Sequence, residues 1–231
     1  ALERNLAALE GVEHAYAFAT GMAALTTLLL ATVRSGDHVV LSDVVYGGTV
    51  RLLRQVLDRF GVECTTFDGA EASSLAAVLR PETRLVLIET PANPTLKLVD
   101  IVAVAKLAHR AGALLAVDNT LLTPILQRPF ELGADVVAYS TTKYLEGHNA
   151  TVGGALLVRD AALAERLQFV RNATGCTQAP WEAWLTLRGL KTLELRMARH
   201  CESALTIARW LEAEPRVARV EPARAADDEG R

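Results

Sequence analysis

Short runs of apolar residues alternate with longer amphipathic segments along most of the chain. Several of these runs are apolar at nearly every position, which is typical of strands whose two faces are both covered. The pattern predicts seven strands, over residues 14–20, 37–43, 62–68, 83–90, 113–120, 135–141 and 154–160.

The segments between these runs have the length of helices and carry apolar residues at i, i+3 and i+4. They predict helices over residues 22–33, 48–61, 71–80 and 100–112. Alternating strands and helices with short connections indicate an α/β domain with a mainly parallel sheet. Ligands of such sheets bind beyond the carboxyl ends of the strands, so the residues just after each strand are the candidates for a site.

The last third of the chain has a different pattern. Residues 161–174 and 180–215 read as helices, and the second is long and interrupted near Gly189. Residues 216–222 could begin one more strand. The final segment, 223–231, has no apolar pattern, and we expect it to be disordered.

Composition narrows the class of protein. The chain has 231 residues, 51% of them hydrophobic, and a formal net charge of −3. That charge is too small to favour nucleic acid or an anionic membrane as partner, and no apolar run reaches the roughly 18 residues that span a bilayer. The opening segment is charged and amphipathic, unlike a signal peptide. Cys64, Cys176 and Cys201 form neither a metal nor a disulfide pattern, which predicts a reducing cytoplasm.

The first two strand ends carry candidates for ligand binding. Gly21 and Met22 open a helix directly after the first strand, where backbone N–H groups suit an anion. An ordinary strand–glycine–helix turn is the alternative. Tyr46 follows the second strand and precedes two glycines, so it could stack on a planar ring or be an ordinary half-buried tyrosine.

Three polar residues follow the next pair of buried strands. Glu89 ends the fourth strand, and Asn93 lies in a loop stiffened by two prolines, which suits either ligand contact or a plain turn. Asp118 ends the fifth strand, where a buried carboxylate is costly without a partner. It either caps a turn or faces a cation.

Lys143 follows Ser140 and Thr142 after the sixth strand. It is either a solvated lysine or the covalent anchor of a cofactor whose phosphate the hydroxyls hold. One helix-plus-strand unit separates it from Asp118, so both should lie at one sheet edge on neighbouring strands. A lysine anchor, a carboxylate for a ring nitrogen, phosphate-binding groups and an aromatic cover together indicate a pyridoxal 5'-phosphate (PLP) site.

A family resemblance strengthens this interpretation. The segments "AFATGMAAL", "YGGT", "ETPANPT", "VDNT", "YSTTKYLEGHNATVGG" and "LRGLKTLELRM" resemble the Cys/Met-metabolism family of PLP-dependent enzymes, in the family's order and through about residue 220. The resemblance implies the large domain of the fold type I PLP-dependent transferases, a mostly parallel seven-stranded sheet between helices.

The resemblance also implies a role for each candidate. Lys143 would be the Schiff-base lysine, Asp118 the partner of the pyridine nitrogen, and Tyr46 the ring-stacking residue that helps protonate the leaving group. Asn93 would contact the ring oxygen or the substrate carboxylate, and Glu89 would be a supporting acid. The phosphate would be held by Gly21, Met22, Ser140 and Thr142.

The activity implied is that of a cytoplasmic, homodimeric or homotetrameric lyase or transferase. It would act on sulfur amino acids or O-acyl-homoserine by γ-replacement or by γ- or β-elimination. We expect a PLP-binding large domain at 1–190 and a long helix beginning a smaller domain at 191–222. The family's N-terminal phosphate clamp and carboxylate-binding small domain have no counterpart, so we expect a truncated chain.

Two other classes stay open. One is a catalytically weak or inactive PLP-binding module of the same family. The other is an unrelated α/β nucleotide-binding protein, against which the lack of a G-x-G-x-x-G or G-x-x-x-x-G-K-[ST] pattern after the first strand counts.

Overall fold

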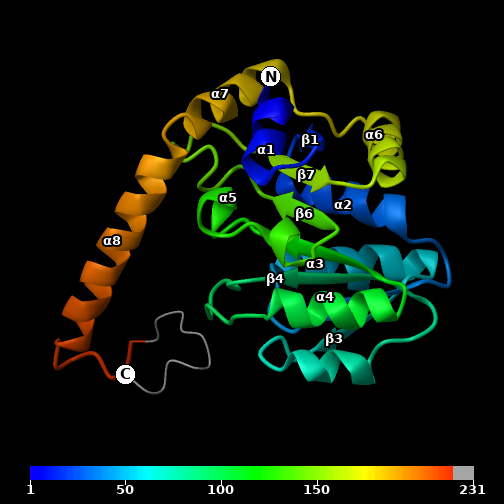
Figure 1. Ribbon diagram of the computed structural model, residues 1–231, viewed down its shortest axis with the longest axis horizontal. Coiled ribbons are helices and arrows are strands. Elements are labelled where there is room, and N and C mark those ends of the chain that lie inside the picture. The colour runs from blue at the N-terminus through cyan, green and yellow to red at the C-terminus, as the bar shows by residue number, and fades with distance from the viewer. Residues whose placement is uncertain (221–231) are drawn as a thin grey trace.

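A seven-stranded sheet forms the centre of the computed structural model, which describes residues 1–220 (Figure 1). All seven predicted strands are present, and each lies inside its predicted range. They are β1 (His14–Phe18), β2 (His38–Ser42), β3 (Glu63–Phe67), β4 (Thr83–Glu89), β5 (Leu114–Asp118), β6 (Val136–Tyr139) and β7 (Gly154–Val158).

The strand order across the sheet is β1-β7-β6-β5-β4-β2-β3. Neighbours from β6 to β3 pair in parallel, whereas β7 is antiparallel to both β6 and β1. The expected mostly parallel sheet is therefore confirmed, with one reversed strand. Because the other strands share one direction, their carboxyl ends meet at one edge of the sheet.

Helices cover both faces of the sheet, so the α/β fold class is confirmed. One core cluster packs α1 (Leu2–Glu10) and α4 (Ile101–Arg110) on one face, and a second packs α2 (Gly21–Thr32) and α6 (Ala161–Thr174) on the other. Alternate residues of β4 point into the two clusters: Val86 into the first and Leu87 into the second. This burial on both faces explains why the strands are apolar throughout.

Polar side chains fix where three of these helices begin. Thr20 accepts a hydrogen bond from the Ala23 N–H at 3.0 Å and caps α2. Asp100 and Asp160 cap α4 and α6 in the same way. Each cap satisfies an N–H group that has no partner within its helix.

The predicted helix over 48–61 is continuous but changes its winding. It consists of α3 (Gly47–Arg51), the π-helical η1 (Leu52–Val56) and the 3₁₀ segment η2 (Leu57–Phe60). Two glycines at its start and the β-branched Val50 and Val56 lower its α-helix propensity. Packing of the buried Leu53 and Leu57 therefore decides its geometry.

The segment predicted as a helix over 71–80 is the 3₁₀ segment η3 (Ala72–Ala77) instead. The Ser74 hydroxyl donates to the Asp68 carbonyl at 3.1 Å. Such side-chain bonds compete with a regular helix, which is the physical reason for the error. Two more short helices, α5 (Thr123–Leu126) and η4 (Pro129–Leu132), lie between β5 and β6.

The C-terminal helices are α7 (Pro180–Leu190) and α8 (Leu193–Glu212), with the break where the sequence predicts it. Figure 1 shows α8 extending away from the sheet. Residues 216–220 form no strand, because the end of α8 brings them to no sheet edge. The rest of that segment and the expected disordered tail, 223–231, lie outside the described residues. No helix within residues 1–220 has the length and apolar character to cross a membrane.

Candidate active site at the carboxyl edge of the sheet

The register of three neighbouring strands aligns the candidate residues. Glu89 at the end of β4 is paired in register with Asp118 at the end of β5, and Asp118 with Ala138 on β6. Two residues after Ala138 the chain leaves the sheet at Ser140, and the turn that begins there carries Lys143. Asp118 and Lys143 thus follow neighbouring strands at one edge, as predicted.

Glu89 ties two loops of this edge together. Its Oε2 accepts a hydrogen bond from the Tyr46 N–H at 2.6 Å, and its Oε1 accepts one from the Asn93 N–H at 3.1 Å. Burial, and then the negative charge of Asp118, raise the pKa of Glu89 to about 7 against the effect of these two bonds. Sequence reasoning placed Glu89 at the edge but missed that it holds both loops.

Asp118 presents one engaged and one open oxygen. Its Oδ1 accepts hydrogen bonds from the Thr120 N–H at 3.0 Å and the Thr120 hydroxyl at 2.5 Å. Its Oδ2 has no hydrogen-bond partner within residues 1–220. Burial raises the pKa of Asp118, and the two bonds from Thr120 oppose that rise.

Thr120 is a further residue that sequence reasoning missed. Its Oγ1 donates to Asp118 and also accepts the Ser140 N–H at 2.8 Å. It therefore links the carboxylate to the turn that carries Lys143. A hydroxyl two residues after a strand-end acid was the available signal.

The N-terminus of α2 adjoins the same turn. A Cβ built on Gly21 would lie 3.0 Å from the Cβ of Ser140, so glycine permits this approach. A Cβ on Gly48 would lie 2.8 Å from the Met22 Sδ and would overlap the Tyr46 ring. Tyr46 is 51% exposed, which is compatible both with a ring-stacking role and with an ordinary half-buried tyrosine.

Lys143 and Thr142 have different surroundings within the turn. Lys143 is exposed, and its amine has no hydrogen-bond or ion-pair partner in the described part of the chain. Thr142 Oγ1 donates to the Gly153 carbonyl at 3.2 Å and accepts the Gly153 N–H at 3.1 Å. Thr142 therefore braces the turn here, and its role in phosphate binding stays a prediction, as do the roles of the other candidates.

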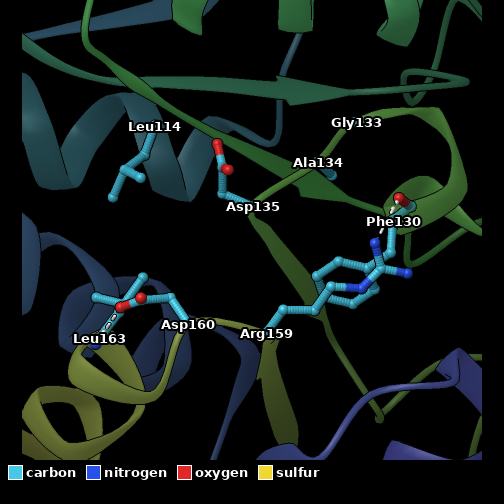
Figure 2. A pocket seen from close by; sticks show the side chains of 8 residues that line it. All are labelled: Leu114, Phe130, Gly133, Ala134, Asp135, Arg159, Asp160 and Leu163. Carbon is cyan, nitrogen blue, oxygen red and sulfur yellow. Dashed lines mark hydrogen bonds between the residues drawn. The ribbon is translucent and has the colours of Figure 1, made fainter.

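A hollow of about 380 Å³ lies at a different place, near the beginning of β5 and β6 (Figure 2). Its charged groups have structural partners: Asp135 accepts the Leu115 N–H at 2.7 Å, and Arg159 donates to the Phe130 carbonyl at 3.1 Å. These contacts account for the polar lining, so the hollow does not compete with the carboxyl edge as a candidate site.

Comparisons with known proteins identify the family of this chain. The family model for Cys/Met metabolism PLP-dependent enzymes matches residues 1–229. A cystathionine gamma-synthase of Mycobacterium tuberculosis is 48% identical over 220 residues, which are 95% of this chain and 57% of the relative. A cystathionine gamma-lyase of Bacillus subtilis is 47% identical over 94% of this chain and 57% of its own length.

A solved structure shares the fold. The crystal structure of metB from Corynebacterium glutamicum superposes with a TM-score of 0.91 at 44% identity, over 93% of this chain and 56% of that one. The chain thus spans little more than half the length of the relatives it matches. Family model, relatives and fold agree, and the chain belongs to the family of Cys/Met metabolism PLP-dependent enzymes.

Proposed function

We propose that this chain forms the PLP-binding part of a transsulfuration-type enzyme that acts on sulfur amino acids or O-acyl-homoserine. The observation that carries this proposal is the register of β4, β5 and β6. It gathers two carboxylates and the Lys143 turn at one edge, beside the N-terminus of α2.

The residues of this edge fit the cofactor. The open Oδ2 of the partly buried Asp118 suits a protonated ring nitrogen, because a carboxylate at the rim of the sheet gains from a cationic partner. The unpaired amine of Lys143 suits covalent attachment. The N-terminus of α2 and the neighbouring Ser140 hydroxyl supply donors for a phosphate. The exposed ring of Tyr46 is free to cover a planar group.

When bound, PLP supplies a conjugated ring that takes up the electrons of a breaking bond at the substrate. Lys143 would anchor the cofactor, and its free amine would accept a proton from the substrate carbon. Asp118 Oδ2 holds a proton at the ring nitrogen. Glu89 keeps the loops of Tyr46 and Asn93 at the site through their backbone N–H groups.

Reductive trapping tests the anchor. The chain incubated with PLP and reduced with borohydride should carry the label on Lys143, and Lys143→Ala should abolish the labelling while the fold is retained. Lys191→Ala is the matched control, because Lys191 is exposed at the end of α7. A label on Lys97, Lys106 or Lys191 instead would refute the assignment.

Turnover tests the reaction. O-succinylhomoserine with cysteine probes γ-replacement, and cystathionine alone probes elimination. Product from either supports the enzyme. Labelling of Lys143 without turnover of any substrate supports the alternative, a PLP-binding module with little or no activity.

We also propose that the protein is a cytoplasmic homo-oligomer, a dimer or a tetramer. Supporting observations are the free Cys64, Cys176 and Cys201 and the exposed, stacked rings of Trp181 and Trp184, whose centroids are 5.0 Å apart. Light scattering of the purified chain measures the oligomeric state, and a monomer at micromolar concentration would contradict it.

A further inference from the structure

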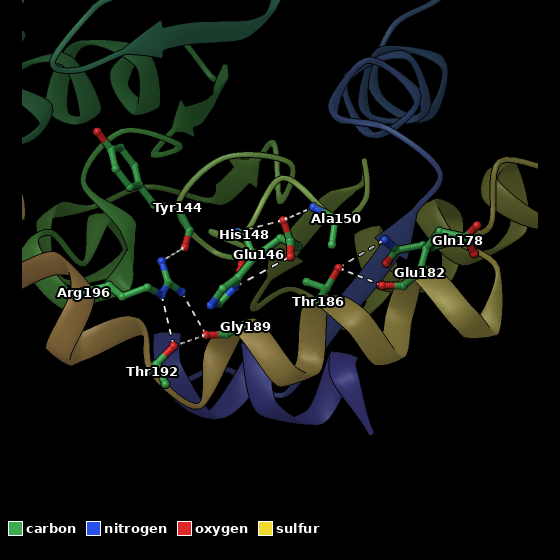
Figure 3. Close-up of polar contacts among 10 residues, drawn as sticks. All are labelled: Tyr144, Glu146, His148, Ala150, Gln178, Glu182, Thr186, Gly189, Thr192 and Arg196. Carbon is green, nitrogen blue, oxygen red and sulfur yellow. Dashed lines mark hydrogen bonds and ion pairs between the residues drawn. The ribbon is translucent and has the colours of Figure 1, made fainter.

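A single arginine at the start of α8 joins three parts of the chain (Figure 3). Arg196 Nη1 donates to the Tyr144 carbonyl at 2.7 Å, and Nη2 donates to the Gly189 carbonyl at 2.8 Å. Its Nε donates to the Thr192 hydroxyl at 3.1 Å. The guanidinium fork therefore connects the turn after Lys143 with the α7–α8 junction.

Two glycines let the turn and the α7–α8 junction approach each other closely. A Cβ on Gly147, which has a φ of 74°, would overlap the guanidinium of Arg196. A Cβ on Gly189 would overlap the backbone of Glu146. At Gly189 the two backbones touch, and at Gly147 only the guanidinium of Arg196 lies between the turn and α8, so a shift of one segment displaces the other.

Glu146 holds the backbone of the same turn through hydrogen bonds. Its side chain is only 2% exposed, and its Oε2 accepts the N–H groups of His148 and Ala150, each at 3.1 Å. Its backbone N–H donates to the Thr141 carbonyl at 3.0 Å. Burial lowers the pKa of Arg196, whereas the negative charge of Glu146 raises it. The two groups therefore attract each other.

The remainder of α8 has few other attachments. Leu193 and Met197 are its buried residues, and the helix then extends away from the sheet (Figure 1). The ring of Tyr144 lies 5.2 Å from that of His200, one turn beyond Arg196. The first turns of α8 thus hold Tyr144 through both its carbonyl and its ring.

Capping of α7 alone does not account for these contacts. The bond to Gly189 satisfies a carbonyl at the end of α7, whereas the bond to Tyr144 reaches the residue next to Lys143. We propose that Arg196 is a positioning residue that fixes the backbone of the Lys143 turn and couples it to α8. This inference rests on the proposed role of Lys143 as the cofactor anchor.

Hydrogen exchange of the full chain tests the coupling without cofactor. Arg196→Gln should raise amide exchange of peptides covering residues 143–150 by about ten- to a hundredfold, the loss expected for charge-assisted hydrogen bonds. Arg196→Lys keeps the charge but lacks the guanidinium fork, so its amide exchange should lie between that of the wild type and that of Arg196→Gln. Arg199→Gln is the matched control, because Arg199 lies one turn away with its side chain 73% exposed.

Capture of PLP gives the second readout. Arg196→Gln should slow labelling of Lys143 by about tenfold, and Arg196→Lys should restore part of the rate. The proposal is overturned if amide exchange in residues 143–150 of both Arg196 variants equals that of the wild type. It is also overturned if Arg199→Gln raises this exchange as much as Arg196→Gln does. If Arg196→Gln does not fold, Arg196→Lys decides by the same two measurements. Failure of the wild type to label Lys143 would refute the proposed function instead, and the exchange experiment would still decide the role of Arg196.

Discussion

Replacing Glu89 by glutamine tests the electrostatics of the carboxyl edge. Glutamine keeps the shape of the side chain and one oxygen that can accept from the Tyr46 or the Asn93 N–H. It removes the ionisable carboxyl group whose pKa is raised by burial and by the charge of Asp118. The variant should therefore differ from the wild type mainly in how its stability depends on pH.

The sign follows from the direction of the shift. The pKa of Glu89 rises from 4.5 to about 7 on folding. Between those values the folded chain holds a proton that the unfolded chain releases, so the free energy of unfolding falls as pH rises. At 1.36 kcal/mol per pH unit the full loss is about 3 kcal/mol, and solvent at this edge should reduce it to about 2 kcal/mol.

Urea unfolding at pH 5 and pH 8 measures this loss. The wild type without added PLP should lose about 2 kcal/mol more than Glu89→Gln over that range. Glu13→Gln is the control, because Glu13 is exposed in the connection between α1 and β1. An equal pH dependence in wild type and Glu89→Gln would refute the assigned titration.

Two further replacements probe neighbouring groups. Asp118→Asn keeps an acceptor for Thr120 but cannot hold a proton at a ring nitrogen, so PLP affinity should fall by about ten- to a hundredfold in a fluorescence titration; unchanged affinity would contradict the pairing. Tyr139→Phe removes the hydroxyl that pairs with the buried Glu10 and accepts from Asn119 at 2.8 Å. It should lower the free energy of unfolding by about 1–3 kcal/mol, and an unchanged urea midpoint would count against that network.

The strands could be predicted because burial on both faces leaves a continuous apolar signal. Val39 to Leu41 and Leu85 to Ile88 are examples, and all of them are essentially inaccessible to solvent. Strand order had no such signal, since it depends on pairing between distant segments. The helix predicted over 71–80 is wrong because the bond from the Ser74 hydroxyl to the Asp68 carbonyl outweighs a weak apolar periodicity.

The candidate site could be located in part because parallel strands collect their following residues at one edge. Asp118, Ser140 and Lys143 were found on that ground. The double role of Glu89, the bridge through Thr120 and the reach of Arg196 depend on loop shape. Local sequence does not encode that shape, because the decisive contacts, Glu89 to Tyr46, Thr120 to Ser140 and Arg196 to Tyr144, join segments far apart along the chain.

The pairing of β1 with β7 has a consequence for synthesis. His14 of β1 lies opposite Val158 of β7, so β1 has no partner in the sheet until the last of the seven strands along the chain has been made. At 5–20 residues per second that interval lasts roughly 7–30 s. During it α1 and β1 expose apolar side chains that later belong to the core. The nascent chain should therefore recruit chaperones at β1, and release should follow once β7 has emerged.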